Sequence, residues 1–187
     1  MLQIDGRKAF GMMLADKMML PSYANIMRAV DKVNVEHDRD YQRMFNAFYK
    51  VRLPDTTYYD GFYHVFEQCK TIRTDLTFGA VLDELYAVTG RMESSFASKI
   101  LATLKSSQPI WDSQVLKYLG IKLTGQTNME KLRSAKEIYS RIEKLYAEYM
   151  RTDNAKSNIA LFNEFLPDYA WISNVKKIDY MMWGLGK

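Results

Sequence analysis

Apolar residues recur along most of this chain at spacings of three, four and seven, which is the spacing of one face of a helix. The clearest case spans residues 128–151, whose apolar stripe consists of Leu132, Ala135, Ile142, Leu145 and Tyr149. No segment alternates apolar and polar residues in the manner of a strand. The pattern therefore predicts an all-α protein.

Capping and helix-breaking residues divide the chain into separate predicted helices. Pro21 ends the first helix and Ser22 caps the second, while Gly90 and Gly120 follow the ends of two later helices. Asp112 begins the helix that Gly120 closes. We predict a surface loop at 153–157 and a frayed tail at 184–186. The predicted helices span residues 7–20, 22–35, 40–51, 57–70, 76–88, 94–104 or 95–104, 112–119, 128–151, 158–165 and 175–183.

Length and composition favour one folded body. The chain has 187 residues, of which 48% are hydrophobic and 26% charged, so it carries enough apolar side chains for a core. We expect a single compact helical domain over residues 1–187, with two lobes sharing a core as the alternative. The net charge of +4 permits binding to nucleic acid without requiring it.

Several classes of function lack their signatures. The single cysteine, Cys69, allows no intramolecular disulfide, and we expect a cytoplasmic protein. No run of about 18 apolar residues predicts a membrane span. His37, His64 and Cys69 follow no metal-ligand spacing, so we expect no metal site. The glycine-rich nucleotide-binding motifs and the G-x-S-x-G hydrolase motif are missing too, and we expect no cofactor.

One stretch carries candidate chemistry. A helix ends near Gly90, a tight turn follows, and the next helix carries Lys99 near its start, where a cation opposes the helix dipole. The chain then reverses at Pro109 and presents Asp112 at a helix start. Two simpler readings stay open: Asp112 is only an N-cap, and Lys99 is only a surface lysine or its ion-pair partner.

This stretch resembles the helix-hairpin-helix DNA glycosylase superfamily, and within it the small bacterial branch similar to 8-oxoguanine DNA glycosylase. The resemblance places a hairpin at 88–95, within a helix-hairpin-helix-like element near residues 76–104. It rests further on Ser98-Lys99, on Pro109-Ile110-Trp111-Asp112 and on the closing segment 175–183. Of the usual Leu-Pro-Gly-Val-Gly hairpin, this chain keeps only Gly90.

The resemblance implies excision of a damaged or modified base from double-stranded DNA by a monomeric enzyme. Asp112 would be the catalytic carboxylate, and Lys99 would either attack the sugar as a nucleophile or stay charged. Trp111 and Trp183 would wall the pocket for the flipped base. The implied DNA contacts are Arg91, Ser94, Ser95, Ser98 and Lys105.

Two other functions stay open at this point. The chain could be a non-catalytic helical DNA-binding module, or a helical protein-interaction subunit whose Met-rich first helix binds a partner. For a glycosylase, the sequence also leaves open which base is released and whether the enzyme serves repair or defence against phages with modified DNA.

Overall fold

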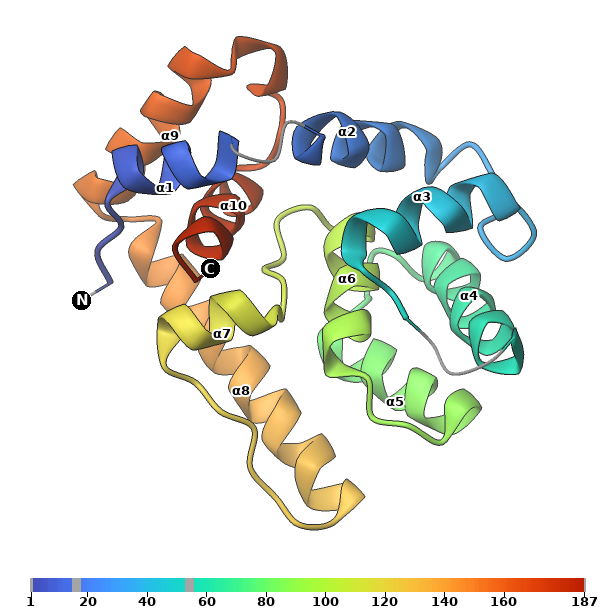
Figure 1. The fold of residues 1–187 in the computed structure, drawn as a ribbon. Coiled ribbons are helices and arrows are strands. Elements are labelled where there is room, and N and C mark those ends of the chain that lie inside the picture. Colours follow the sequence, from blue (N-terminus) through green and yellow to red (C-terminus); the bar gives the residue numbers. More distant parts are fainter. Residues whose placement is uncertain (1, 15–17, 53–55, 187) are drawn as a thin grey trace. The chain divides into compact units, whose positions relative to one another are not determined.

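The fold of this chain, in a computed structural model that describes residues 2–14, 18–52 and 56–186, is built from helices. No strand occurs in these ranges, which confirms the predicted all-α class. The chain forms two compact units, drawn in Figure 1. Unit 1 combines Met1–Asp16 with Ser106–Lys187, and unit 2 is the continuous segment Lys17–Lys105.

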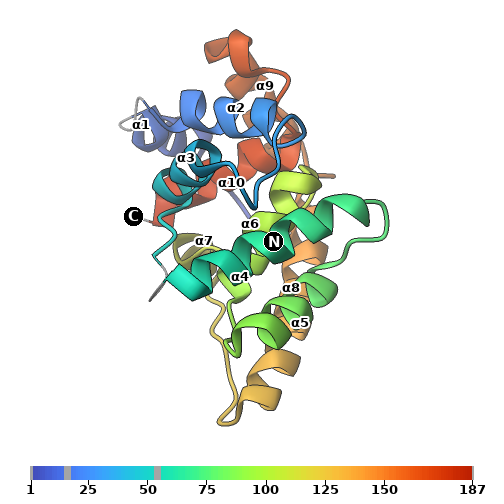
Figure 2. The same cartoon turned by 90° about the vertical axis from the view of Figure 1, so that its right-hand side faces the viewer.

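Unit 2 is organised around an aromatic core. In it α5 (Phe78–Thr89) packs on α4 (Thr56–Thr71) and α6 (Ser94–Leu104), and α2 (Met19–Ala29) packs on α3 (Arg39–Tyr49) (Figure 2). The Phe45 ring lies 5.2 Å from Phe66 and 6.1 Å from Phe62, and all three side chains are fully buried.

Unit 1 is organised around α10 (Asn174–Gly186), which packs against α1, α7 and α9 (Figure 1). Ile178, Met181 and Met182 on this helix are fully buried, so α10 supplies much of the apolar core. The other elements are α1 (Gly6–Leu14), α7 (Ser113–Leu119), α8 (Asn128–Tyr149), α9 (Asp153–Phe165) and the short 3-10 helix η1 (Pro167–Tyr169).

Local capping chemistry sets many helix ends. Gly90 and Gly120 close α5 and α7 in left-handed conformations, with φ of 67° and 66°, as the sequence predicts. Thr127 and Glu130 form a reciprocal capping box at the start of α8. These short-range signals account for the agreement between predicted and observed ends.

Four predicted boundaries are wrong, one of them the end of the helix predicted at 22–35, because α2 ends at Ala29 and turns follow it. Pro21 does not end a helix: it lies in the first turn of α2, where a missing N–H breaks no helical hydrogen bond, and Ser22 is therefore not a cap. The predicted loop at 153–157 is the first turn of α9, capped by Thr152. The predicted frayed tail belongs to α10, because Gly184 and Gly186 are buried.

Gly186 seats the end of α10 directly on α7. A Cβ atom at Gly186 would stand 2.4 Å from the carbonyl oxygen of Gln114, so only glycine allows this approach. Lys117 Nζ also donates a hydrogen bond of 3.0 Å to the carbonyl of Gly186. The last turn of α10 is thus fitted to the first turns of α7.

Within the described ranges, no helix combines the length and the apolar character that crossing a membrane requires.

Candidate functional site

The predicted site residues are divided between the two units. Lys99 and the predicted DNA contacts Arg91, Ser94, Ser95, Ser98 and Lys105 belong to unit 2, whereas Trp111, Asp112 and Trp183 belong to unit 1.

In unit 2, α5 and α6 pack together and are joined by the four residues 90–93. Gly90 starts the connection in a left-handed conformation and donates its N–H to the carbonyl of Tyr86 at 2.8 Å. The geometry is that of two helices linked by a tight turn, at the position where the sequence predicts a hairpin. Its identity as a DNA-binding hairpin stays a prediction.

Lys99 lies in the middle of α6 and not near its start as predicted, and with only 6% of its surface exposed it is not a surface lysine. Its Nζ donates a hydrogen bond of 3.0 Å to the carbonyl of Tyr49. The same nitrogen lies 5.2 Å from the centre of the Phe96 ring and 5.8 Å from that of Tyr49. A carbonyl oxygen and two aromatic faces stabilise a cation, so these contacts favour a charged ammonium.

The two predicted cationic DNA contacts differ in accessibility. Arg91 is exposed, pairs with Glu93 at 3.3 Å and lies over the Tyr58 ring. Lys105 Nζ instead donates hydrogen bonds to the carbonyls of Thr74 at 2.7 Å and Leu76 at 2.9 Å. Each cation already has two partners, but Arg91 is exposed and Lys105 is half-buried, so Arg91 is the more accessible to a phosphate.

The serines gather at the start of α6. No side chain caps this helix, whose N-cap position is Glu93. Ser94 Oγ is buried and has no hydrogen-bond partner among the described residues, while Ser98 Oγ donates to the carbonyl of Ser95 at 2.9 Å. Uncapped N–H groups at a helix start attract anions, and Ser94 adds a hydroxyl beside them.

In unit 1, Asp112 is the N-cap of α7. Its Oδ1 accepts the N–H of Gln114 at 2.8 Å, and its backbone carbonyl accepts the N–H of Leu116. Among the described residues, Gln114 is the one hydrogen-bond donor to this carboxylate. The side chain is only partly buried. Asp112 therefore has the N-cap role that the sequence left open, and capping uses one of its two carboxylate oxygens.

The segment that leads to Asp112 is held from two other helices. Tyr139 of α8 donates a hydrogen bond of 2.7 Å from its hydroxyl to the carbonyl of Pro109. The backbone N–H of Ile110 interacts with the carboxylate of Asp179 on α10. Trp111 is 7% exposed. The residues before Asp112 are thus held by a hydrogen bond from α8 and by the burial of Trp111, beside the carboxylate of Asp179.

Asp179 is the centre of a buried polar cluster that the sequence analysis did not single out. Only 3% of it is exposed; its Oδ1 accepts the hydroxyl of Tyr146, and its Oδ2 lies 3.8 Å from Lys176 Nζ. Burial raises the pKa of Asp179 to about 6, against the lowering effects of Lys176, Tyr146 and Ile110. Burial lowers the pKa of Lys176. The negative charges of Asp179 and Asp112 act in the opposite direction and raise that pKa.

One sequence signal could have revealed this cluster. Lys176 and Asp179 stand one helical turn apart in the segment 175–183, whose other members are mostly apolar. Opposite charges on a helix that apolar residues bury on all sides must pair inside the protein. Trp183, the second predicted pocket residue, lies on the same helix and is half-buried.

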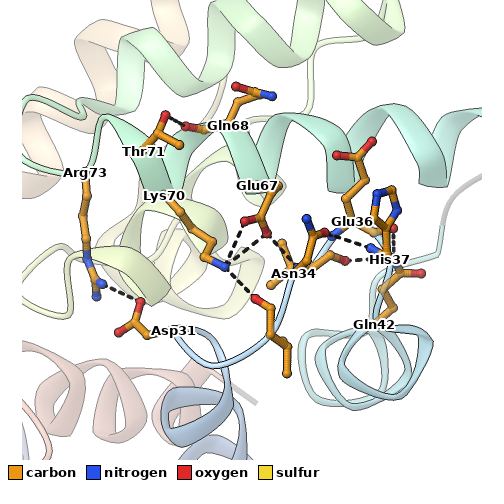
Figure 3. Close-up of polar contacts among 12 residues, drawn as sticks. Asp31, Asn34, Glu36, His37, Gln42, Glu67, Gln68, Lys70, Thr71 and Arg73 are labelled. Atoms are coloured by element: carbon orange, nitrogen blue, oxygen red, sulfur yellow. Dashed lines mark hydrogen bonds and ion pairs between the residues drawn. The ribbon is translucent and has the colours of Figure 1, made fainter.

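A second polar cluster in unit 2 has a structural role. Figure 3 shows Lys70, whose Nζ donates to the carbonyl of Val33 at 2.7 Å and to Glu67 at 3.1 Å. Glu67 accepts the N–H of Val35 at 2.7 Å, and Gln42 donates to the carbonyl of Val35 at 2.9 Å. These hydrogen bonds fix the connection between α2 and α3. The polar groups of Lys70, Glu67 and Gln42 are thus used in holding the fold together.

Comparison with known proteins gave no match among protein-family models, curated proteins or solved structures. Within the described ranges, no three His, Cys, Asp or Glu side chains are grouped so as to hold a metal ion.

Proposed function

We propose that this chain is a DNA glycosylase that removes a damaged or modified base by hydrolysing its N-glycosidic bond, with Asp112 as the catalytic carboxylate. The observation that carries the proposal is the anchoring of residues 109–112, which presents a partly exposed carboxylate at the start of α7. Preorganised charge of this kind is the largest single contributor to many enzymatic rates.

The chemistry requires a fixed negative charge. Breaking an N-glycosidic bond develops positive charge on the sugar, which a nearby carboxylate stabilises while it activates the attacking water, as in glycoside hydrolysis. Capping occupies Oδ1 of Asp112 through Gln114. The role we propose therefore falls to Oδ2, since the cap holds the carboxylate without using both oxygens.

DNA binding in this proposal begins at the first turn of α6. Its N–H groups without a side-chain cap suit a phosphate oxygen, and exposed Arg91 adds charge nearby. Phosphate contacts displace counterions, so affinity for duplex DNA should fall steeply as salt rises. Affinity that is insensitive to salt would count against this part of the proposal.

The deciding experiment measures abasic sites. The purified protein is incubated with duplexes that carry different damaged bases and with phage genomic DNAs that carry modified bases, beside Asp112→Asn. Asparagine caps a helix about as well as aspartate does, so this variant should stay folded and bind DNA while losing base release. Abasic sites made by the wild type alone would support the proposal.

Other outcomes favour the alternatives. Tight, salt-sensitive DNA binding without abasic sites on any substrate favours a non-catalytic DNA-binding module. A mass that rises with concentration, without DNA affinity at low salt, favours a protein-interaction subunit. Base release at equal rates from the wild type and Asp112→Asn would leave a glycosylase whose carboxylate lies elsewhere.

A further inference from the structure

Burial of the Asp179 carboxylate makes an unfavourable contribution to the free energy of folding. It is buried together with Lys176, and its Oδ2 has no hydrogen-bond partner among the described residues. Removing two charges from water carries a desolvation penalty that a 3.8 Å pair offsets poorly, and apolar replacements of such pairs are often neutral or stabilising. Stability alone therefore does not explain this pair in unit 1.

The cluster has a direct structural route to Asp112. Asp179 joins three parts of unit 1: it stands on α10, accepts the Tyr146 hydroxyl from α8, and interacts with the backbone N–H of Ile110. Ile110 is two residues before Asp112, in a segment that Tyr139 also holds through Pro109. The Asp179 carboxylate therefore lies beside the backbone that leads to Asp112.

The cluster also has an electrostatic route. The charge of Asp112 acts on Asp179 and on Lys176, and the Lys176 ammonium balances both carboxylates. The groups that face Asp179 are Lys176 on its own helix, Tyr139 and Tyr146 on α8, and Ile110 N–H and Asp112 in the segment before α7. Lys176 thus limits the repulsion between the carboxylates of Asp112 and Asp179.

We propose that Asp179, supported by Lys176 and Tyr146, is a positioning residue that fixes the Pro109–Asp112 backbone and so sets the location of the Asp112 carboxylate. This inference rests on the proposed function for its catalytic consequence. Its structural content, that Asp179 controls the geometry of the cap at Asp112, is independent of the reaction.

The chain offers a matched control for this idea. Lys176 and Lys177 are adjacent on α10 and both are buried, but Lys177 Nζ donates to the carbonyl of Ala170 at 2.8 Å instead of facing Asp179. Lys176→Met and Lys177→Met thus each remove one buried ammonium from the same helix. Only Lys176→Met should affect Asp112.

The test has a structural readout and a kinetic one. NMR of the full chain follows the amide of Gln114, which reports the cap at Asp112, in wild type, Asp179→Asn, Tyr146→Phe and the two lysine variants. We expect its chemical shift and hydrogen-exchange protection to change in Asp179→Asn and Lys176→Met, and more weakly in Tyr146→Phe. Lys177→Met should match the wild type.

Single-turnover base release is measured on the same proteins. Asp179→Asn should slow release roughly 10- to 100-fold, because misplacing a reacting group by about 1 Å can have an effect of that size. The dissociation constant for DNA should stay unchanged, which a general loss of folding would not allow. Tyr146→Phe, which keeps the carboxylate, supplies a milder variant if Asp179→Asn unfolds.

The outcomes separate the two proposals. An unchanged Gln114 amide in folded Asp179→Asn or Tyr146→Phe overturns the positioning role, whatever the activity. Equal changes of the Gln114 amide in Lys176→Met and Lys177→Met overturn it as well, since the loss of either buried ammonium would then disturb the cap at Asp112. A perturbed amide in proteins that release no base from any DNA supports the positioning role and removes the proposed function.

Discussion

Asp179 should leave a signature in the pH dependence of stability. Its pKa is raised from 3.8 to about 6 by burial, so between these values the folded protein binds more protons at this group than the unfolded chain does. Stability therefore falls as pH rises through that window. The full effect is on the order of 3 kcal/mol, because one pKa unit corresponds to about 1.4 kcal/mol.

Asp179→Asn removes this group from the titration. We expect urea unfolding at pH 4 and pH 7 to show the variant gaining stability relative to the wild type as pH rises, by up to that amount. Lys177→Met serves as the control and should show no such trend. A difference between Asp179→Asn and wild type that stays constant with pH would contradict the raised pKa.

The surroundings of Lys99 predict the type of glycosylase. An attacking amine must be neutral, whereas the Tyr49 carbonyl and the faces of Tyr49 and Phe96 favour the ammonium. We therefore expect abasic sites without strand breaks, and no protein–DNA adduct after borohydride treatment. An adduct that forms with the wild type and is lost in Lys99→Gln would show the lysine to be a nucleophile.

Residues differ in how much of their role the sequence reveals. The position of Asp112 at a helix start follows from neighbours within a few residues, so the pattern predicts it. The Asp179 cluster depends on contacts with Tyr146 and Ile110, which lie far away along the chain. The burial of Lys99 likewise depends on α3, through Tyr49. The pairing of Lys176 with Asp179 has a local signal, but the contacts with these distant residues have none.

At the scale of elements, the fit of α10 on α7 makes Gly186 sensitive. We expect Gly186→Ala to destabilise the protein and to shift the Gln114 amide, since the new Cβ would stand 2.4 Å from a backbone oxygen. Gly11→Ala in α1 is the control, because nothing lies within 4 Å of its Cβ position. That change should stabilise the protein by roughly 0.5–1 kcal/mol.

Thermal unfolding of the two alanine variants measures the contrast. Similar melting temperatures for both variants would show that α10 and α7 can move apart without a loss of stability. The close contact at Gly186 would then not be required for the fold.

Helix boundaries were predictable where a cap lies in the chain itself, as at Gly90, Gly120 and Thr127. They were not predictable where packing decides. Pro21 is a strong local stop signal, yet it occupies a first turn, in which a proline has no hydrogen bond to break. The glycines near the end of α10 look like a frayed tail until α7 is seen to bury one of them.

At the scale of the whole molecule, unit 2 is continuous in sequence and has its own aromatic core. We expect residues 17–105, expressed alone, to unfold cooperatively on heating and to show helical circular dichroism, because a chain of this size with a core can fold independently. Residues 106–187 expressed alone lack α1, so we expect them to be less stable than unit 1 is in the full chain. A non-cooperative transition for residues 17–105 would contradict the autonomy of unit 2.

The discontinuity of unit 1 has a consequence for synthesis on the ribosome. Its first helix, α1, leaves the exit tunnel early but packs against α10, which follows only after all of unit 2 has been translated. Asp112 is likewise made long before Asp179. A nascent chain can therefore fold unit 2 while the anchor of the proposed catalytic carboxylate is still missing, so any activity at this site would begin only when translation has passed α10.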